Sequence, residues 1–239
     1  MASIPTHPSP GSGFSWTVEA PAGWLVVPPR GFVAAATISE WERNAVALVA
    51  DSLGPDPDPG PARPDGRAAL SGPATDDDPA TDDDVRAEGL RIAAAAVAGL
   101  REFADGVAPD GNRVLAAVGV LGRTPVPVLV AVGTGPSDDD GAGLLAALGA
   151  TGGTPLVPPT IEYPDLPDGD GVRVTRLDVG EGTGGAWVSV TLGRRTEHGD
   201  AVADTVLVCR SQDLFLGAVL SDLLDELLPA VKISRRDAS

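Results

Sequence analysis

Three strand-like runs followed by a long apolar helix form the end of this chain, and that order limits the fold more than any other feature of the sequence. The runs cover 171–179, 186–194 and 201–210, and only short segments separate them. Such short connections join antiparallel neighbours, because a parallel crossover needs a dozen or more residues. The sequence therefore predicts an antiparallel meander covered by the helix that follows it.

The preceding sequence groups its strands and helices in the same way. Two strands are predicted at 14–20 and 24–27, then two helices, two strands at 112–121 and 126–132, and a short helix at 141–148. Pro127 fits a strand only near its start or at a sheet edge. Hairpin-linked strands with helices between the groups predict an α+β fold, in which helices cover an antiparallel sheet of about six to seven strands.

Apolar residues at helical spacing predict the buried face of each long helix. The first helix begins at the capping box Thr37-x-x-Glu40, and the second begins in the acidic residues 82–84 and ends near Gly106 and Pro109. The final helix runs from its N-cap Ser211 to about Leu228, with Asp213 near its positive end. The predicted core positions are Trp41, Ala45, Leu48 and Val49 in the first helix, Val85, Ile92, Ala96, Leu100 and Phe103 in the second, and Phe215, Val219, Leu223 and Leu227 in the last. In the last helix a neighbouring row, Leu216, Leu220, Leu224 and Leu228, widens the apolar face that is expected to cover the sheet.

Residues 54–84 differ in composition from the rest of the chain. These 31 residues contain 7 Pro, 4 Gly and 9 Asp against 2 Arg, and their only large aliphatic residue is Leu70. Such a segment buries too little apolar surface to offset the entropy lost on ordering. We therefore expect a single α+β domain at 14–232 with a disordered acidic insertion at 54–84, a disordered N-terminus at 1–13 and a loose tail at 233–239. The insertion has two interpretations: it is a solvated acidic linker, or it is a segment dedicated to binding.

The overall charge limits the class of partner. The chain has 17 Lys and Arg against 34 Asp and Glu, which gives a net charge of −17. A surface of this sign repels phosphate backbones and anionic lipid headgroups, so we expect no nucleic-acid partner. The N-terminus lacks the features of a signal peptide. The longest apolar runs of the whole chain are shorter than the ~18–20 residues of a membrane span. We therefore expect a cytoplasmic protein without membrane insertion.

Few residues in the chain are suited to catalysis at neutral pH. Cys209 is the single cysteine, which excludes an internal disulfide, and on its apolar strand it is interpreted as a buried thiol. The two histidines are His7 in the N-terminal segment and His198, which is interpreted as an exposed residue of a turn at 196–200. No Gly-x-Ser-x-Gly elbow is present to pair a serine with His198.

The glycine-rich and acidic motifs match binding fingerprints incompletely. Residues 133–138 (GTGPSD) follow a strand and precede a helix, but Asp138 replaces the third glycine of a dinucleotide loop, and Asp138–Asp140 would repel a pyrophosphate. The segment 180–185 is interpreted as a hairpin loop. The acidic groups at 76–78, 82–84, 138–140 and 168/170 lack EF-hand spacing. We therefore expect no catalytic residue, no cofactor and no metal site.

Two segments of the chain combine aromatic, proline, glycine and acidic residues in recognisable motifs. The first is Phe-x-Trp…Pro-x-Gly-Trp-x-x-x-Pro, and the second is Ser-x-Asp-Leu…Leu-x-Asp-Leu-Leu-Asp after three strands. The matching residues are Phe14, Trp16, Pro21, Gly23, Trp24 and Pro28 in the first segment, and Ser211, Asp213, Leu214, Leu220, Asp222, Leu223, Leu224 and Asp225 in the second. With these motifs the chain resembles a loose family of actinobacterial proteins. The resemblance implies a PsbP-like fold, an α/β/α sandwich. It also implies a gene position beside components of type VII (ESX-like) secretion, and it carries over no catalytic residues.

These observations favour one function and leave one alternative. We expect a non-enzymatic interaction or accessory protein with a protein partner, associated with a type VII-like secretion system. The near absence of His, Lys and Cys argues against an enzyme, because these residues perform much of the acid/base and nucleophilic chemistry at neutral pH. The alternative is a small-ligand-binding protein or an enzyme that uses a pocket without a sequence signature.

Overall fold

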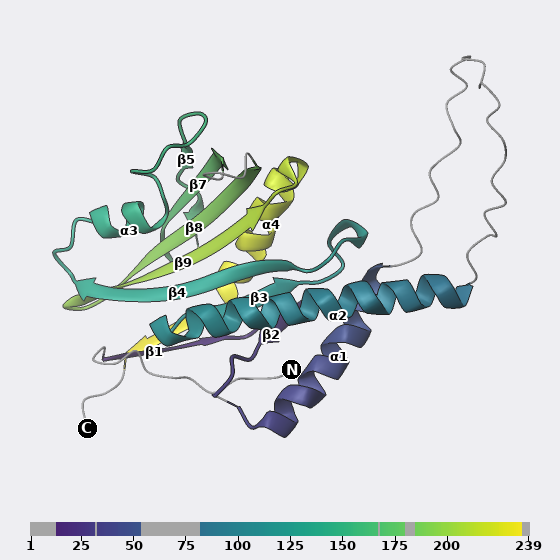
Figure 1. Ribbon diagram of the computed structural model, residues 1–239. Coiled ribbons are helices and arrows are strands. Elements are labelled where there is room, and N and C mark those ends of the chain that lie inside the picture. Colours follow the sequence, from purple (N-terminus) through teal and green to yellow (C-terminus); the bar gives the residue numbers. More distant parts are fainter. Residues whose placement is uncertain (1–12, 32, 54–81, 167, 180–184, 236–239) are drawn as a thin grey trace, which may run out of the picture.

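The structure is a computed structural model, and it describes residues 13–31, 33–53, 82–166, 168–179 and 185–235 (Figure 1). The predicted linker residues 54–81, the N-terminal segment 1–12 and residues 236–239 lie outside these ranges. No helix within the described ranges is long and apolar enough to cross a membrane.

An antiparallel sheet of eight strands is the centre of the fold, as the sequence predicts (Figure 1). Seven strands follow the order β2-β3-β4-β9-β8-β7-β5, and β6 also pairs with β7. The count exceeds the predicted six to seven because the Pro-rich segment 154–167 contains two strands too short to show a pattern. The strands are β2 (Trp24–Val27), β3 (Arg113–Ala117), β4 (Val126–Pro136), β5 (Thr160–Glu162), β6 (Asp165–Leu166), β7 (Gly169–Val179), β8 (Ala186–His198) and β9 (Ala201–Ser211).

The two ends of the described chain meet in a separate two-stranded ribbon. Strand β1 (Phe14–Val18) pairs antiparallel with β10 (Val231–Arg235), and Thr17 lies opposite Lys232. The prediction of a loose tail from residue 233 is therefore wrong for residues 233–235. The apolar residue Val231 is fully buried, so this strand adds to the core rather than extending into solvent.

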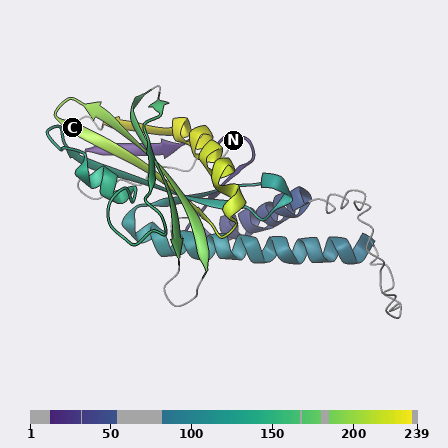
Figure 2. The same ribbon diagram turned by 90° about the horizontal axis from the view of Figure 1, so that it is seen from above.

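Helices cover both faces of the sheet (Figure 2). On one face lie α1 (Ala35–Leu53), α2 (Asp82–Val107) and the short α3 (Ala142–Ala147); α4 (Gly217–Leu227) lies on the other face. Helix α2 begins at Asp82, and the acidic residues Asp83 and Asp84 lie in its first turn, where the helix dipole favours carboxylates. Four short 3-10 turns complete the described elements: Ala108–Asp110, Val120–Gly122, Leu214–Leu216 and Leu228–Ala230.

The predicted starts of two helices are wrong. Helix α1 begins at Ala35, so Thr37 lies inside the first turn and is not the N-cap. Ser211 ends β9, and its hydroxyl accepts a hydrogen bond from the Asp213 amide at 3.0 Å. Asp213 is the cap: its side chain accepts from the Phe215 amide at 3.0 Å, at the start of the turn before α4.

The buried rows of α2 and α4 match the predicted faces only in part. In α4 the neighbouring leucine row of the predicted face lies on the sheet, whereas Phe215 is 95% exposed. In α2, Val85 and Phe103 are exposed, and in α1 Leu48 is exposed. The buried apolar positions are Ala45 and Val49 in α1, Ala93, Val97, Leu100 and Ala104 in α2, and Leu216, Leu220, Leu224, Leu227 and Leu228 in and around α4. Each displaced row is next to the predicted one, because both rows are apolar and only the packing partner selects between them.

Candidate functional site

The central strands of the sheet differ sharply between their two faces. Toward α4, the side chains in the middle of β4 and β9 are fully buried, such as Val128, Val130 and Leu207 at 0% exposure. Toward α2 and α3, five alternating residues of the same strands are only half-buried, although Val202 nearer the start of β9 is buried. These five residues, which we call the uncovered strip, are Pro127, Leu129, Ala131, Val206 and Val208.

The strip lies between two small clusters that belong to different helices. On one side, Leu100 and Ala104 of α2 pack on β2 and β3, with Leu129 at the margin of that cluster. On the other side, Leu144 and Leu148 at α3 pack on β7, with Val206 at the margin. Helix α3 comes very close to the sheet there, since a side-chain carbon at Gly193 would lie 2.7 Å from Leu148. On this face the helices therefore cover β2 and β3 on one side and β7 on the other, and they cover β4 and β9 between them only in part.

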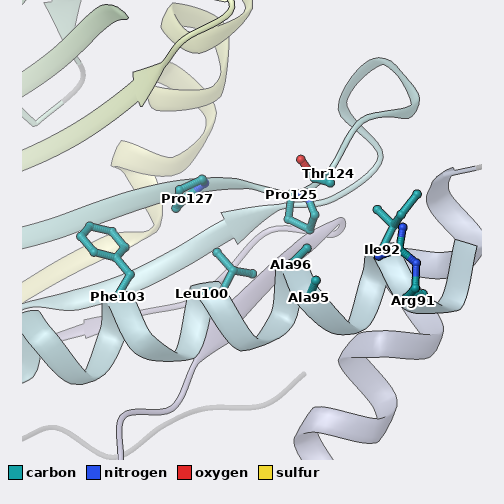
Figure 3. Close-up of a pocket in the computed structure, with 10 residues that line it drawn as sticks. Arg91, Ile92, Ala95, Ala96, Leu100, Phe103, Thr124, Pro125 and Pro127 are labelled. Carbon is teal, nitrogen blue, oxygen red and sulfur yellow. The ribbon is translucent and has the colours of Figure 1, made fainter. Parts of the chain in front are cut away.

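An apolar groove lies where α2 passes β4, and it opens onto the strip. Its volume is about 430 Å³. Figure 3 shows Leu100 and Phe103 on α2 directed toward the start of β4, where Pro125 and Pro127 form the opposite wall. Phe103 remains 40% exposed, which is unusual for an aromatic side chain beside a core. The lining residues of this α2 groove are Arg91, Ile92, Ala95, Ala96, Gly99, Leu100, Phe103, Thr124, Pro125 and Pro127.

Charged groups flank the combined surface at two places. On the exposed face of α2, Arg91 pairs with Glu88, and the Arg91 hydrogen bond lowers the pKa of Glu88. Across β4, Arg210 follows Cys209, which pairs with Val128, so Arg210 lies beside Pro127 on the same face. Arg210 is exposed, and no ion pair or side-chain hydrogen bond joins it to the rest of the described chain.

The polar side chains around α3 have structural roles. Arg195 donates to both Asp204 oxygens at 2.8 and 2.7 Å, and to Asp139 at 2.8 Å. The hydrogen bond to Asp204 is the main cause of the raised pKa of Arg195, and the hydrogen bond from Arg195 is the main cause of the lowered pKa of Asp139. Asp140 accepts from the Ala142 amide at 2.9 Å. Asp139 therefore connects the start of α3 to the sheet, and Asp140 holds the backbone at the first residue of the helix.

The glycine motif at 133–136 continues a strand. Gly133 pairs with Asp204 and Pro136 with Ala201, so β4 extends through the segment and no phosphate loop forms there. The prediction that β4 ends near Val132 is wrong by four residues. The hairpin glycines 180–184 and the acidic residues 76–78 lie outside the described residues, as does His7.

The remaining candidate residues are separated in space. His198 ends β8 and is half-buried, with its ring 5.1 Å from that of Phe14, so its interpretation as an exposed turn residue is wrong. Cys209 is buried as predicted, and burial raises its pKa to about 12. Asp168 lies 3.7 Å from Arg194. Among the described residues, no three His, Cys, Asp or Glu side chains gather as metal ligands would.

Sequence reasoning assigned Phe103 to the core and did not identify the groove. One signal was available: the apolar surface of α2 is wider than a single core face, since Ile92, Ala96 and Phe103 stand beside the buried row Ala93 and Val97. A helix with two adjacent apolar faces contacts the core with one and leaves the other for a further contact.

Comparison with known proteins adds one distant likeness. No protein-family model and no curated protein matches the chain. Among solved structures, it is similar to LpqN of Mycobacterium tuberculosis, described as involved in cell envelope biogenesis, at 10% identity. The TM-score is 0.44, and the match covers 95% of this chain and 87% of that chain. Because the identity and the TM-score are both low, this likeness establishes neither a shared family nor a shared function, and the PsbP-like resemblance stays a prediction.

Proposed function

We propose that this protein is a non-enzymatic interaction protein that holds a short amphipathic helix of a protein partner on the uncovered strip. The observation that carries the proposal is the contrast between the two sides of β4 and β9: Val128 and Leu207 are completely buried under α4, while Leu129 and Val208 on the other side are half-buried. A helix laid beside α2 would complete the layer on that side.

The dimensions of the α2 groove suit such a helix. The groove follows α2 from Arg91 to Phe103, a rise of about 18 Å, or roughly three helical turns. Its lining is apolar apart from Arg91 and Thr124, which matches the helix-in-groove mode of recognition with apolar anchors at i, i+3, i+4 and i+7. Phe103, the last α2 residue of the lining, offers an aromatic contact, and aromatic residues often dominate binding energy.

The chemistry of the lining also supports a non-enzymatic role. The ten lining residues include no carboxylate, histidine, cysteine or lysine, which are the groups that most often transfer protons or attack as nucleophiles. Thr124 has the single hydroxyl of the lining and is exposed at the rim. Binding, rather than chemical conversion, is the role that these side chains can perform.

The partner belongs, in this proposal, to a type VII-like secretion system in the cytoplasm. Support comes from the sequence resemblance at the two ends of the domain, and from the fit of a helical partner to the groove. Small helical proteins encoded beside the gene are therefore the candidates to test first.

The test is co-purification of tagged protein with those neighbouring gene products, using two matched variants. Phe103→Glu places a charge in the α2 groove, whereas Leu90→Glu places one on the opposite side of the same helix, at a site 44% exposed. An aromatic side chain buried in an interface often contributes about 2 kcal/mol to the binding free energy, so its loss should raise the dissociation constant of the complex about thirtyfold. We expect that loss for Phe103→Glu and unchanged binding for Leu90→Glu. Equal binding by both variants would show that the partner, if captured, docks elsewhere.

A further inference from the structure

The strip ends in a row of polar side chains that the apolar groove does not explain. In the strand register, Arg176 of β7 lies opposite Ser189 of β8, and Ser189 lies opposite Arg210 of β9. Pro127 of the α2 groove continues the same row. Val128 of β4 pairs with Cys209 of β9, so the residues next to them, Pro127 and Arg210, lie side by side. These side chains share one face of the sheet, because cross-strand neighbours point to the same side. The apolar strip therefore runs directly into a polar row.

Three buried donors in or beside this row have no acceptor among the described residues, and one of them is the Nε–H of Arg176. Ser189 is 4% exposed, and its hydroxyl has no hydrogen-bond partner among the described residues. The indole N–H of Trp187, two residues earlier on the same face, is also buried and unpaired within the described chain. An indole can only donate, and a buried donor without an acceptor is unfavourable. The Ser189 hydroxyl and the Trp187 indole are therefore suited to a ligand that brings an acceptor.

Arg210 adds an available positive charge. Other arginines on this part of the sheet are occupied: Arg176 binds Asp178 at 2.8 Å, and Arg195 binds Asp204 and Asp139. Arg210 is exposed and has no such partner in the described part of the chain. Two carboxylates near Arg210 in the described chain are already paired: Asp178, which lies opposite Trp187, accepts from Arg176, and Asp213 pairs with Arg123. In a chain of net charge −17, Arg210 is a point where an anion can approach the sheet.

We infer that the docked helix carries an Asp or Glu whose carboxylate binds Arg210 beside Ser189 and Trp187. The inference rests on the proposed function, because it names the chemistry of the partner for that same strip. A guanidinium and a carboxylate form a charge-assisted pair, and the hydroxyl and indole N–H supply further donors to the same anion. The partner is therefore amphipathic in a defined sense: its apolar face lies along α2, and one acidic side chain lies where the helix passes Arg210.

The acid site can be tested on the full chain without the partner, by NMR titration with small mimics of side chains. Butanoate mimics a Glu side chain, butanamide is its neutral counterpart, and inorganic phosphate is a competing anion. We expect butanoate to shift the Trp187 indole N–H in a saturable way and to bind at least tenfold more tightly than butanamide. Arg210→Gln should weaken butanoate at least tenfold, whereas Arg86→Gln, which changes another exposed and unpaired arginine of the described chain, should not. Equal effects of the two variants, or tighter binding of phosphate than of butanoate, would overturn the inference.

Co-purification with Arg210→Glu separates the two proposals. If Phe103→Glu releases the partner and Arg210→Glu also weakens it tenfold or more, both stand. If Phe103→Glu releases it while Arg210→Glu does not, the acidic anchor is wrong and the groove remains the docking site. If neither variant weakens the complex, the docking site itself is wrong. Unchanged far-UV circular dichroism of both variants shows that the fold is retained.

Discussion

Replacing Leu224 by Ala tests which row of α4 holds the helix on the sheet. Leu224 is 0% exposed and lies in the main core with Val128 and Val190. The change removes three carbon atoms, which is about 2.4 kcal/mol of transfer free energy at about 0.8 kcal/mol per methylene. The cavity left behind raises the total loss of unfolding free energy to about 3–4 kcal/mol, within the usual range for buried leucines.

The matched variant is Phe215→Ala, which trims a larger side chain that is 95% exposed. Its unfolding free energy should change by less than about 0.5 kcal/mol, because surface substitutions away from packing contacts have small effects. Leu223→Ala, at a half-buried position, should lie between the two.

Urea denaturation followed by circular dichroism measures these differences, and thermal melts give a second estimate. The Leu224 variant should melt roughly 6–16 °C below the parent, at about 2–4 °C per kcal/mol for a domain of this size. A loss for Phe215→Ala as large as that for Leu224→Ala would refute the placement of α4. It would mean that the helix is rotated about its axis, as the sequence pattern first suggested.

Three further outcomes are expected. Lowering the pH should weaken the Asp139–Arg195 contact that anchors α3, because the hydrogen bond from Arg195 lowers the Asp139 pKa. The stabilisation from this contact is complete above the unfolded pKa of ~3.9 and is lost as the pH falls through the lower pKa of the folded state. In denaturation measured at several pH values, Asp139→Asn should remove this part of the pH dependence of stability. Cys209 should resist a thiol reagent at pH 8 in the native protein and react on unfolding, because burial raises its pKa to about 12; rapid native labelling would contradict this. In urea denaturation, Glu42→Ala should destabilise the protein by about 1–3 kcal/mol more than Arg101→Met does. The reason is that Arg101 is buried and would keep an unpaired charge, whereas Glu42 is 44% exposed. A larger loss for Arg101→Met would contradict the ion pair between Arg101 and Glu42.

The antiparallel sheet could be predicted because its signals are local. Strands β7, β8 and β9 alternate and are joined by short connections, so each fixes the position of the next. The strands β5 and β6 could not be predicted, since three and two residues carry no periodicity. The candidate site was predicted least well: Phe103 was recognised as apolar, but its neighbour across the groove, Pro127, comes from a different part of the chain.

The sequence by itself determined the order and type of the main elements, the burial of Cys209 and the absence of a recognisable catalytic motif, because these follow from composition and from spacing along the chain. Tertiary structure alone decided three features. It paired Phe14 with Arg235, which no local pattern could show. It chose the Leu220 and Leu224 row of α4 over the equally apolar row beside it. It also left the sheet only partly covered between α2 and α3. The width of that strip depends on how far apart the two helices pack on the sheet, and this distance is set by contacts between segments that are distant in the sequence.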